Sequence, residues 1–150
     1  MATIRRSYKP GDFELAVRRS MTGLGLFTES IIPKGACVIE YTGRILGPGE
    51  DEDVSGRYLF EVHSRRTIDG SPRSNTARYI NHSCKPNCEP MIHNNRVFIF
   101  AKRAIKPGEE LSYNYGKAYF DTYIKPHGCL CPKCRAATMA KKRRAATKGL

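Results

Sequence analysis

The chain has 150 residues, of which 40% are hydrophobic and 27% charged, a composition typical of one folded domain with a modest core. Its 13 glycines and 9 prolines predict many turns and short elements, which argues against a helix bundle. The 26 basic residues outnumber the 14 acidic ones, so the net charge of +12 excludes neither an enzyme nor a binding protein but predicts affinity for polyanions such as nucleic acid.

No apolar run approaches the roughly 20 residues that a membrane-spanning helix needs. Residues 1–13 carry positive charge without a following apolar stretch, so we expect no secretory signal and an intracellular protein. Six cysteines in such a reducing compartment favour metal binding or thiol chemistry over disulfides.

The predicted elements are short strands separated by turns. Alternation of apolar and polar residues over 13–17 predicts a half-buried strand, and further strands are expected at 36–41, 58–62, 97–101 and 111–115. The continuous apolar run of the fourth segment is typical of a buried strand. No segment shows helical periodicity over about 12 residues, so the domain is predicted to be mainly β.

Two Pro-Gly turns each lead into a strand that ends in tyrosine. The first is Pro33–Gly35, which precedes the strand ending at Tyr41, and the second is Pro107–Gly108, which precedes the strand ending at Tyr115. This repetition predicts two similar hairpins rather than a repeat array.

Charge is unevenly placed along the chain. Residues 136–150 are basic and alanine-rich without an acidic residue, which predicts a mobile tail or a fraying helix. Such a tail keeps the protein soluble, contacts nucleic acid or acts as a targeting signal. The acidic run Glu50–Asp53 predicts an exposed loop or, alternatively, a surface that recruits a basic partner.

Three of the six cysteines lie close together, at Cys129, Cys131 and Cys134. Thiols at this spacing are awkward partners for disulfides but suit a shared Zn²⁺ ion, and a structural zinc site needs a fourth protein ligand. The candidates for that ligand are Cys84, Cys88 and Cys37, with His82 and His127 as further alternatives.

Two other segments indicate a functional role. Residues 78–88 place many hydrogen-bonding side chains around Ile80 and a Pro-Asn turn, although an Asn-His pair considered alone is more often structural than a ligand site. Residues 23–27 are interpreted as a glycine-rich turn where the backbone can approach a ligand closely. Their spacing differs from that of a dinucleotide-binding fingerprint.

In combination these segments resemble a known family. The order and spacing of the motifs are similar to those of a SET-domain protein-lysine methyltransferase with a post-SET zinc segment and no pre-SET segment. The motifs are Gly23–Phe27, Glu40–Gly43, Tyr58–Phe60, Arg78–Cys84, Glu110–Gly116 and Cys129–Cys134. The resemblance implies a mainly β SET-domain fold of small curved sheets with a C-terminal pseudoknot, a rare exception to unknotted topology.

The resemblance also implies that S-adenosylmethionine and the target lysine enter from opposite faces and meet in a narrow channel. The residues that match cofactor-binding positions are Leu24, Gly25, Leu26, Tyr58, Arg78, Asn81, His82 and Leu130. Tyr41 and Tyr113 match walls of the lysine channel, and Tyr115 matches the catalytic tyrosine beside the transferred methyl group.

In the same scheme one structural Zn²⁺ ion is bound by four cysteines, Cys84, Cys129, Cys131 and Cys134. This ion would clamp the C-terminal segment over the active site. Cys88 is then a buried or free thiol, and Cys37 belongs to the core. The spacing C-x-C-x₂-C is shorter than the C-x-C-x₄-C that is common in the family.

Lysine attacks a methyl group only as a neutral amine. Its ordinary pKa is about 10.4, so deprotonation at pH 7 costs roughly 4.6 kcal/mol at about 1.36 kcal/mol per pH unit. An apolar aromatic channel disfavours the ammonium form, and a positive sulfonium adds repulsion. In-line geometry then matters more than a strong base, so we expect Tyr115 to orient the reacting groups rather than to act as a general base.

We expect an N-terminal extension at 1–12, a SET domain at 13–118, a post-SET zinc segment at 119–135 and a basic tail at 136–150. Tyr113 occupies the position where the family has Phe or Tyr. A tyrosine hydroxyl there can hold a water that a further methyl group would displace, so mono- or dimethylation is favoured over trimethylation.

The predicted substrate is a histone or another basic DNA-associated protein, in a chromatin- or chromosome-associated setting. The acidic run would form a rim for this substrate, the basic tail would contact nucleic acid without sequence preference, and no membrane partner is expected. One alternative is a catalytically silent basic SET-fold module that binds nucleic acid or chromatin, against which Asn81, His82 and Tyr115 argue. The other is a small zinc-ribbon nucleic-acid binder, which explains only the cysteines and the tail.

Overall fold

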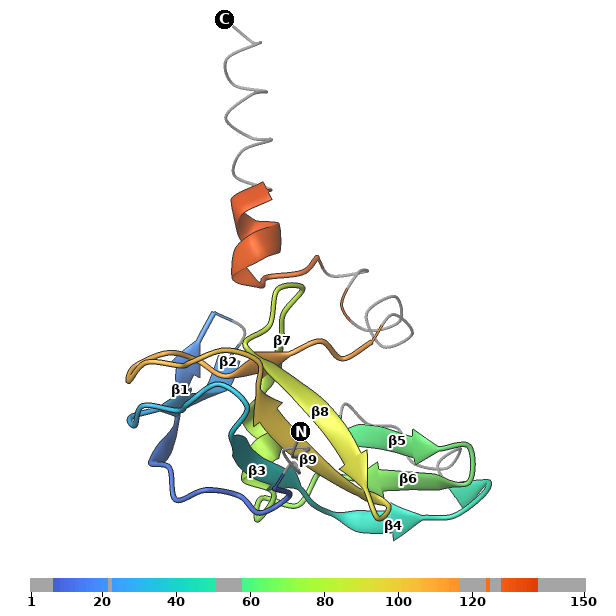
Figure 1. Cartoon of the computed structure of the whole chain (residues 1–150). Helices are drawn as coiled ribbons and strands as arrows, with labels where there is room; N and C mark the ends of the chain where they lie inside the picture. Colours follow the sequence, from blue (N-terminus) through green and yellow to red (C-terminus); the bar gives the residue numbers. More distant parts are fainter. Residues whose placement is uncertain (1–6, 22, 51–57, 117–123, 125–127, 138–150) are drawn as a thin grey trace, which may run out of the picture.

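The structure is a computed structural model that describes residues 7–21, 23–50, 58–116, 124 and 128–137. Over these residues the chain forms short β-strands in four small sheets, with little helix (Figure 1). The prediction of a mainly β fold built from small sheets is confirmed.

The first sheet is a hairpin of β1 (Leu15–Ser20) and β2 (Gly23–Thr28), which pair antiparallel. The strand predicted at 13–17 is confirmed in kind, although it begins two residues later. The interpretation of residues 23–27 as a turn is wrong, because this segment is strand β2. Pairing with β1 satisfies its backbone, and Leu26 is buried in the core.

The second sheet has the order β3-β9-β8. Its central strand β9 (Arg96–Ala101) pairs antiparallel with β3 (Cys37–Tyr41) on one side and with β8 (Cys88–His93) on the other. These strands contribute residues to both clusters of the hydrophobic core.

Strand β9 is buried on both of its faces. Val97 and Ile99 belong to the main core cluster, whereas Phe98 and Phe100 form a second cluster on the opposite face. Tyr8 packs against this second cluster and makes edge-to-face contacts with both phenylalanines. The continuous apolar run at 97–101 is thereby explained, and the buried strand predicted there is confirmed.

The third sheet has the order β4-β6-β5 and is antiparallel throughout. It consists of β4 (Arg44–Leu46), β6 (Arg66–Asp69) and β5 (Leu59–His63). Strand β5 confirms the strand predicted at 58–62, shifted by one residue. Tyr58 therefore lies immediately before the strand rather than within it.

The two Pro-Gly turns have similar backbones but do not begin similar hairpins. Gly35 and Gly108 have φ values of 83° and 89°, which glycine adopts without strain. The hairpin prediction is wrong, because β3 pairs with β9, and β10 (Ser112–Tyr113) pairs in parallel with β7 (Asn81–His82). Pairing with strands distant in the sequence is favoured over local hairpins because it buries both tyrosine-ended strands in one core. The strand predicted at 111–115 is accordingly reduced to two residues.

The helical parts of the described chain are short. The 3₁₀ helix η2 (Thr76–Tyr79) leads into β7, and residues 132–137 are helical. No helix among the described residues is long and apolar enough to cross a membrane. Most of the predicted basic tail, from residue 138 on, and residues 51–53 of the acidic run lie outside the described residues.

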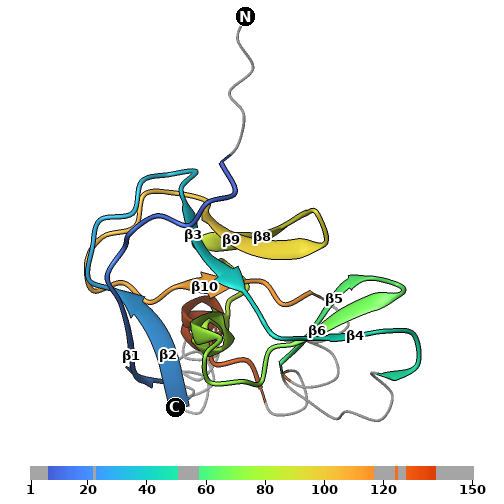
Figure 2. The same ribbon diagram turned by 90° about the horizontal axis from the view of Figure 1, so that it is seen from below.

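Strand β10 lies near the middle of the molecule, between the β1–β2 hairpin and the β4-β6-β5 sheet (Figure 2). The segment before β10 is tied to the hairpin by a bridge between Phe27 and Glu110 and by a 2.8 Å hydrogen bond from Leu111 N to Leu26 O. The parallel β7–β10 pair thus brings a late segment of the chain between earlier elements. The pseudoknot itself stays a prediction.

A buried asparagine joins the loops that frame this centre. Asn75 is 1% exposed; its Nδ2 donates to Gly70 O at 3.0 Å, and its Oδ1 accepts from Thr42 N at 3.1 Å. A side chain at Gly70 would overlap the ring and hydroxyl of Tyr41. Asn75 therefore holds the chain of residue 70 in close contact with Tyr41.

Replacing Asn75 with alanine should lower the free energy of unfolding by about 2 kcal/mol, because the buried Gly70 carbonyl and the Thr42 N–H lose their partner. Urea denaturation followed by circular dichroism measures this loss. The exposed Lys102 provides the control, since Lys102→Ala should change the same quantity by less than about 0.5 kcal/mol. Equal stability of the two variants would show that the loops do not depend on Asn75.

Candidate active site and metal centre

Two of the sequence motifs meet at the β7–β10 pair. Asn81 pairs with Ser112 and His82 with Tyr113, and Ser83 N donates to Tyr113 O at 3.1 Å. The Asn-His-Ser-Cys motif and the Tyr-Asn-Tyr motif therefore lie side by side, although about thirty residues separate them in the chain. Backbone pairing rather than side-chain contact sets their register.

The Asn81 amide connects this pair to the hairpin. Its Nδ2 lies 3.0 Å from Leu24 O, 3.1 Å from Ser20 Oγ and 2.8 Å from Glu110 Oε2. The structure thus brings Asn81 and the backbone of Leu24 together, as expected for two residues of one site. The contribution of Glu110 was not foreseen from the sequence.

His82 lies between the tyrosine motif and the cysteine cluster. Its Nδ1 accepts a hydrogen bond from Tyr115 N at 3.1 Å, so this nitrogen carries no proton. Its Nε2 lies 3.4 Å from Cys84 Sγ, and the ring packs edge-on against Tyr115 with centroids 5.5 Å apart. Burial lowers the pKa of His82 below its usual value, which favours the neutral ring.

A row of aromatic rings leads away from His82. Tyr115 contacts Tyr113 at 4.8 Å between centroids, Tyr113 contacts Phe60 at 6.5 Å, and Phe60 contacts Tyr41 at 5.4 Å. The predicted channel residues therefore come together. Phe60 completes the row but was not predicted, although its place in the Tyr58–Phe60 motif was the available signal.

Backbone carbonyls fix the hydroxyl groups at both ends of this row. Tyr41 Oη donates to Tyr58 O at 2.6 Å, and Tyr115 Oη donates to Ile80 O. Tyr41 and Tyr113 are only 4% and 6% exposed. The row is thus a largely dry wall whose polar atoms have set directions.

Arg78 contacts two tyrosines that lie close to the row in the sequence, Tyr58 and Tyr79. Its guanidinium lies 4.3 Å from the centre of the Tyr58 ring and 5.1 Å from that of Tyr79, and it donates to Ser71 O. These contacts hold the segment whose carbonyl accepts the Tyr41 hydroxyl.

A cavity of about 570 Å³ adjoins Asn81 and His82, a volume typical of small-molecule sites. Of the eight predicted cofactor residues, Asn81, His82 and Leu130 line it. Tyr58 and Arg78 do not line this cavity, and Leu26 is fully buried in the core. Leu24 and Gly25 do not line it either, and the cofactor roles of all eight residues stay predictions.

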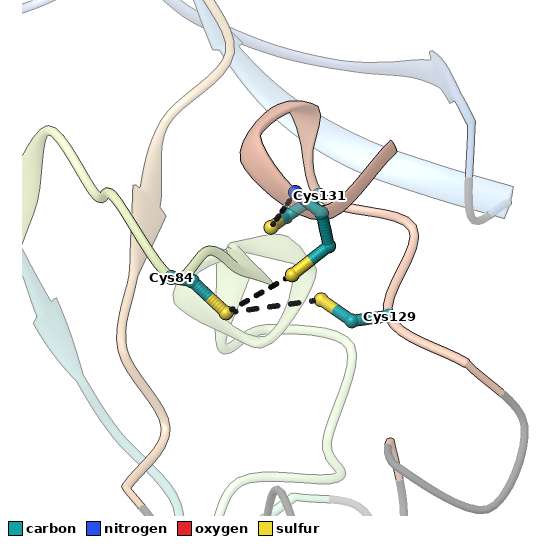
Figure 3. Close-up of side chains that lie close together, drawn as sticks. Cys84, Cys129 and Cys131 are labelled. Atoms are coloured by element: carbon teal, nitrogen blue, oxygen red, sulfur yellow. Dashed lines mark hydrogen bonds between the residues drawn. The ribbon is translucent and has the colours of Figure 1, made fainter. Parts of the chain in front are cut away.

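Four cysteine sulfurs gather where the C-terminal segment meets the core (Figure 3). The cluster consists of Cys84, Cys129, Cys131 and Cys134, whose Sγ atoms all lie within 4.8 Å of one another. Cys84 Sγ lies 4.0 Å from Cys129 Sγ and 3.6 Å from Cys134 Sγ. The short C-x-C-x₂-C spacing therefore still lets four thiols face one point, where they could hold a metal ion.

The other cysteines lie elsewhere. Cys37 and Cys88 are buried in the core, and burial raises the pKa of Cys37 to about 11 and that of Cys88 to about 12. Of the alternatives for the fourth ligand, the geometry thus favours Cys84. His82 touches Cys84 rather than replacing it, and His127 lies outside the described residues.

The thiols of the cluster differ in pKa. Burial raises the pKa of Cys129 and of Cys134 to about 11. Burial also acts to raise the pKa of Cys131, but hydrogen bonds from Cys84, Cys134 and Cys129 outweigh it and lower that pKa to about 6. The surrounding hydrogen bonds therefore favour the thiolate form of Cys131, and a bound metal ion would displace the protons of the remaining thiols.

Comparison with known proteins finds similar sequences over most of the chain. The SET domain family model matches residues 23–116. The chain is 34% identical over 145 residues to the histone-lysine N-methyltransferase trithorax of Drosophila virilis, which covers 89% of this chain. It is 38% identical over 131 residues to the histone-lysine N-methyltransferase trr of Drosophila melanogaster, which covers 79% of it. The chain spans only 4% and 5% of the lengths of these two relatives.

A solved structure shows the same fold. The crystal structure of KRYPTONITE in complex with mCHH DNA, an H3(1-15) peptide and SAH superposes with a TM-score of 0.68 at 35% sequence identity. The match covers 87% of this chain and 30% of the KRYPTONITE chain.

The four-cysteine cluster should bind one metal ion per chain. Co²⁺ added to metal-free protein should give the thiolate charge-transfer absorption of a tetrahedral site, and Cys84→Ser and Cys134→Ser should both weaken it strongly. Cys37→Ala is the matched control and should keep the full absorption, since Cys37 lies outside the cluster. Unchanged absorption in both serine variants would rule out this ligand set.

Proposed function

Because the chain belongs to the SET-domain family, we propose that it is a protein-lysine N-methyltransferase that transfers a methyl group from S-adenosylmethionine to a lysine ε-amine. The observation that carries the proposal is the contact of His82 with Tyr115, which joins the cavity wall to the row of aromatic rings. A methyltransferase needs such a junction, because the cofactor and the lysine must meet at one point.

The residues of the cavity fit S-adenosylmethionine. Its volume of about 570 Å³ suits a ligand of that size, Asn81 offers an amide, and the half-exposed Leu130 offers an apolar cover. When bound, this cofactor supplies a methyl group on a positively charged sulfur. The domain division at 13–118 and 119–135 is part of the proposal, since Leu130 comes from the second segment.

The row of aromatic rings favours the neutral form of the substrate lysine. Tyr41 and Tyr113 are buried, so an ammonium group that lies against this row would lose much of its hydration, and the neutral amine is favoured. Tyr115 Oη donates a hydrogen bond to Ile80 O. Its oxygen is thereby turned to accept weak C–H or N–H contacts, a role in orientation rather than proton abstraction.

A Zn²⁺ ion fits the four-cysteine cluster. Tetrahedral coordination with Zn–S bonds of about 2.3 Å places the sulfurs about 3.8 Å apart. The distances from Cys84 Sγ to Cys129 Sγ and to Cys134 Sγ, 4.0 and 3.6 Å, bracket that value. The ion would hold the segment that carries Leu130 against the core.

The proposed substrate is a lysine in a basic protein tail, such as that of a histone. The matched relatives are histone-lysine N-methyltransferases, and KRYPTONITE was crystallised with an H3 peptide and DNA. We propose a chromatin- or chromosome-associated location on the same grounds. A catalytically silent module is not favoured, because binding alone requires neither the dry tyrosine row nor its junction with a cavity.

Incubation with S-adenosylmethionine should methylate lysines in a panel of histones and other basic proteins, read by mass spectrometry. Tyr115→Phe should lower kcat about a hundredfold, because it removes the hydroxyl that orients the reacting groups. Tyr8→Phe is the matched control, since Tyr8 packs in the second core cluster, and its kcat should be unchanged. Absence of methylation on every panel member, or full activity of Tyr115→Phe, would refute the proposal.

The number of methyl groups tests the role of Tyr113. The wild-type protein should stop at mono- or dimethyllysine. Tyr113→Phe removes the hydroxyl and the water bound to it, so a further methyl group fits and the product should shift towards trimethyllysine. Mass spectrometry of a single-lysine peptide at long reaction times separates these products. Efficient trimethylation by the wild type would contradict this role.

A further inference from the structure

Glu110 lies in the wall of the cavity on a well-fixed segment. Its Oε2 accepts a hydrogen bond from Asn81 Nδ2 at 2.8 Å, and both residues line the cavity. Its backbone forms the bridge with Phe27, and its carbonyl accepts from Asn87 Nδ2 at 2.8 Å. Because Asn87 is 4% exposed, this anchoring lies within the protein interior. The carboxylate is therefore presented to Asn81 from a rigid base.

The partners of Asn81 decide which way its amide is turned. The Leu24 carbonyl and Glu110 Oε2 both accept hydrogen bonds from Asn81 Nδ2, so the NH₂ group faces both of them. The Oδ1 atom is then directed away from these two groups. Asn81 is also one of the residues that line the cavity.

A glycine leaves the space that this carboxylate needs. A Cβ at Gly25 would overlap Glu110 Oε2 and lie 3.0 Å from Glu110 Cδ. Any side chain at this position would push the carboxylate away from Asn81. The absence of a side chain at Gly25 therefore leaves room for the Glu110 carboxylate beside Asn81.

We propose that Glu110 is a positioning residue for the cofactor: it holds the Asn81 amide with Oδ1 turned to the cavity, where it accepts a hydrogen bond from the ammonium group of the cofactor's amino-acid end. The proposal rests on the proposed function, since it requires S-adenosylmethionine as the ligand. An ammonium group offers only donors, so a flipped amide would present the wrong group to it. The negative charge of Glu110 also favours a cation nearby.

Two ligands separate this role from general damage to the site. S-adenosylhomocysteine carries the amino-acid end, whereas 5′-methylthioadenosine keeps the adenosine and the sulfur but lacks it. In isothermal titration, Glu110→Ala should weaken the affinity for S-adenosylhomocysteine about tenfold and leave that for 5′-methylthioadenosine unchanged. Glu110→Gln keeps an oxygen that can accept from Asn81, so it should lose only about threefold.

Two further variants sharpen the test. Glu109→Gln removes the same charge from the same wall, but Glu109 pairs with Arg103, so the ratio of the two affinities should stay that of the wild type. In an Asn81→Ala background, Glu110→Ala should have little further effect, because Glu110 acts through Asn81.

Three outcomes would overturn the inference. They are equal weakening of both ligands by Glu110→Ala, a Glu110→Gln variant as weak as Glu110→Ala, or a full effect of Glu110→Ala without Asn81. Thermal melting of each variant shows whether it is folded. If the wild-type protein binds neither ligand, the proposed function fails and this inference with it; if it binds both and the ratio does not move, only the inference fails.

Discussion

The closure of the C-terminal segment onto the core through four cysteine sulfurs is the interaction on which the site depends. Cys84 follows β7, whereas its three partners come from a segment about fifty residues later, so the cluster joins two parts of the chain that share no strand pairing there. Leu130 lies between two of these cysteines and lines the cavity. The cavity wall therefore contains a residue that lies between two members of the sulfur cluster.

The rest of the site is held by backbone groups. The hydroxyls of Tyr41 and Tyr115 donate to carbonyls, Tyr115 N donates to His82, and the Asn81 amide bonds to Leu24 O. Such contacts make the directions of the polar atoms a property of the fold rather than of side-chain mobility. A reaction that needs a neutral amine in line with a carbon atom benefits from this rigidity, because little reorganisation is left for the reaction itself.

Local patterns allowed the sequence to predict the mainly β fold and the buried strand β9. The resemblance to SET domains implied the grouping of Cys84 with the three C-terminal cysteines, where local patterns had left the fourth ligand open. The order of the motifs also predicted a common site for Asn81, His82 and Leu130, and these three residues line one cavity. The sequence did not predict that residues 23–27 form a strand or that β10 pairs with β7, because such pairings are selected by burial in a common core. Phe60 and Glu110 were missed for a related reason, since their roles arise from neighbours distant in the sequence.

Titration of S-adenosylhomocysteine into the metal-loaded and the metal-stripped protein tests the dependence of the cavity on the sulfur cluster most directly. If the ion holds Leu130 in the wall, stripping the metal should weaken binding at least about tenfold, and restoring Zn²⁺ should recover it. Equal affinities with and without the metal, in protein that remains folded, would contradict the view that the cluster completes the site.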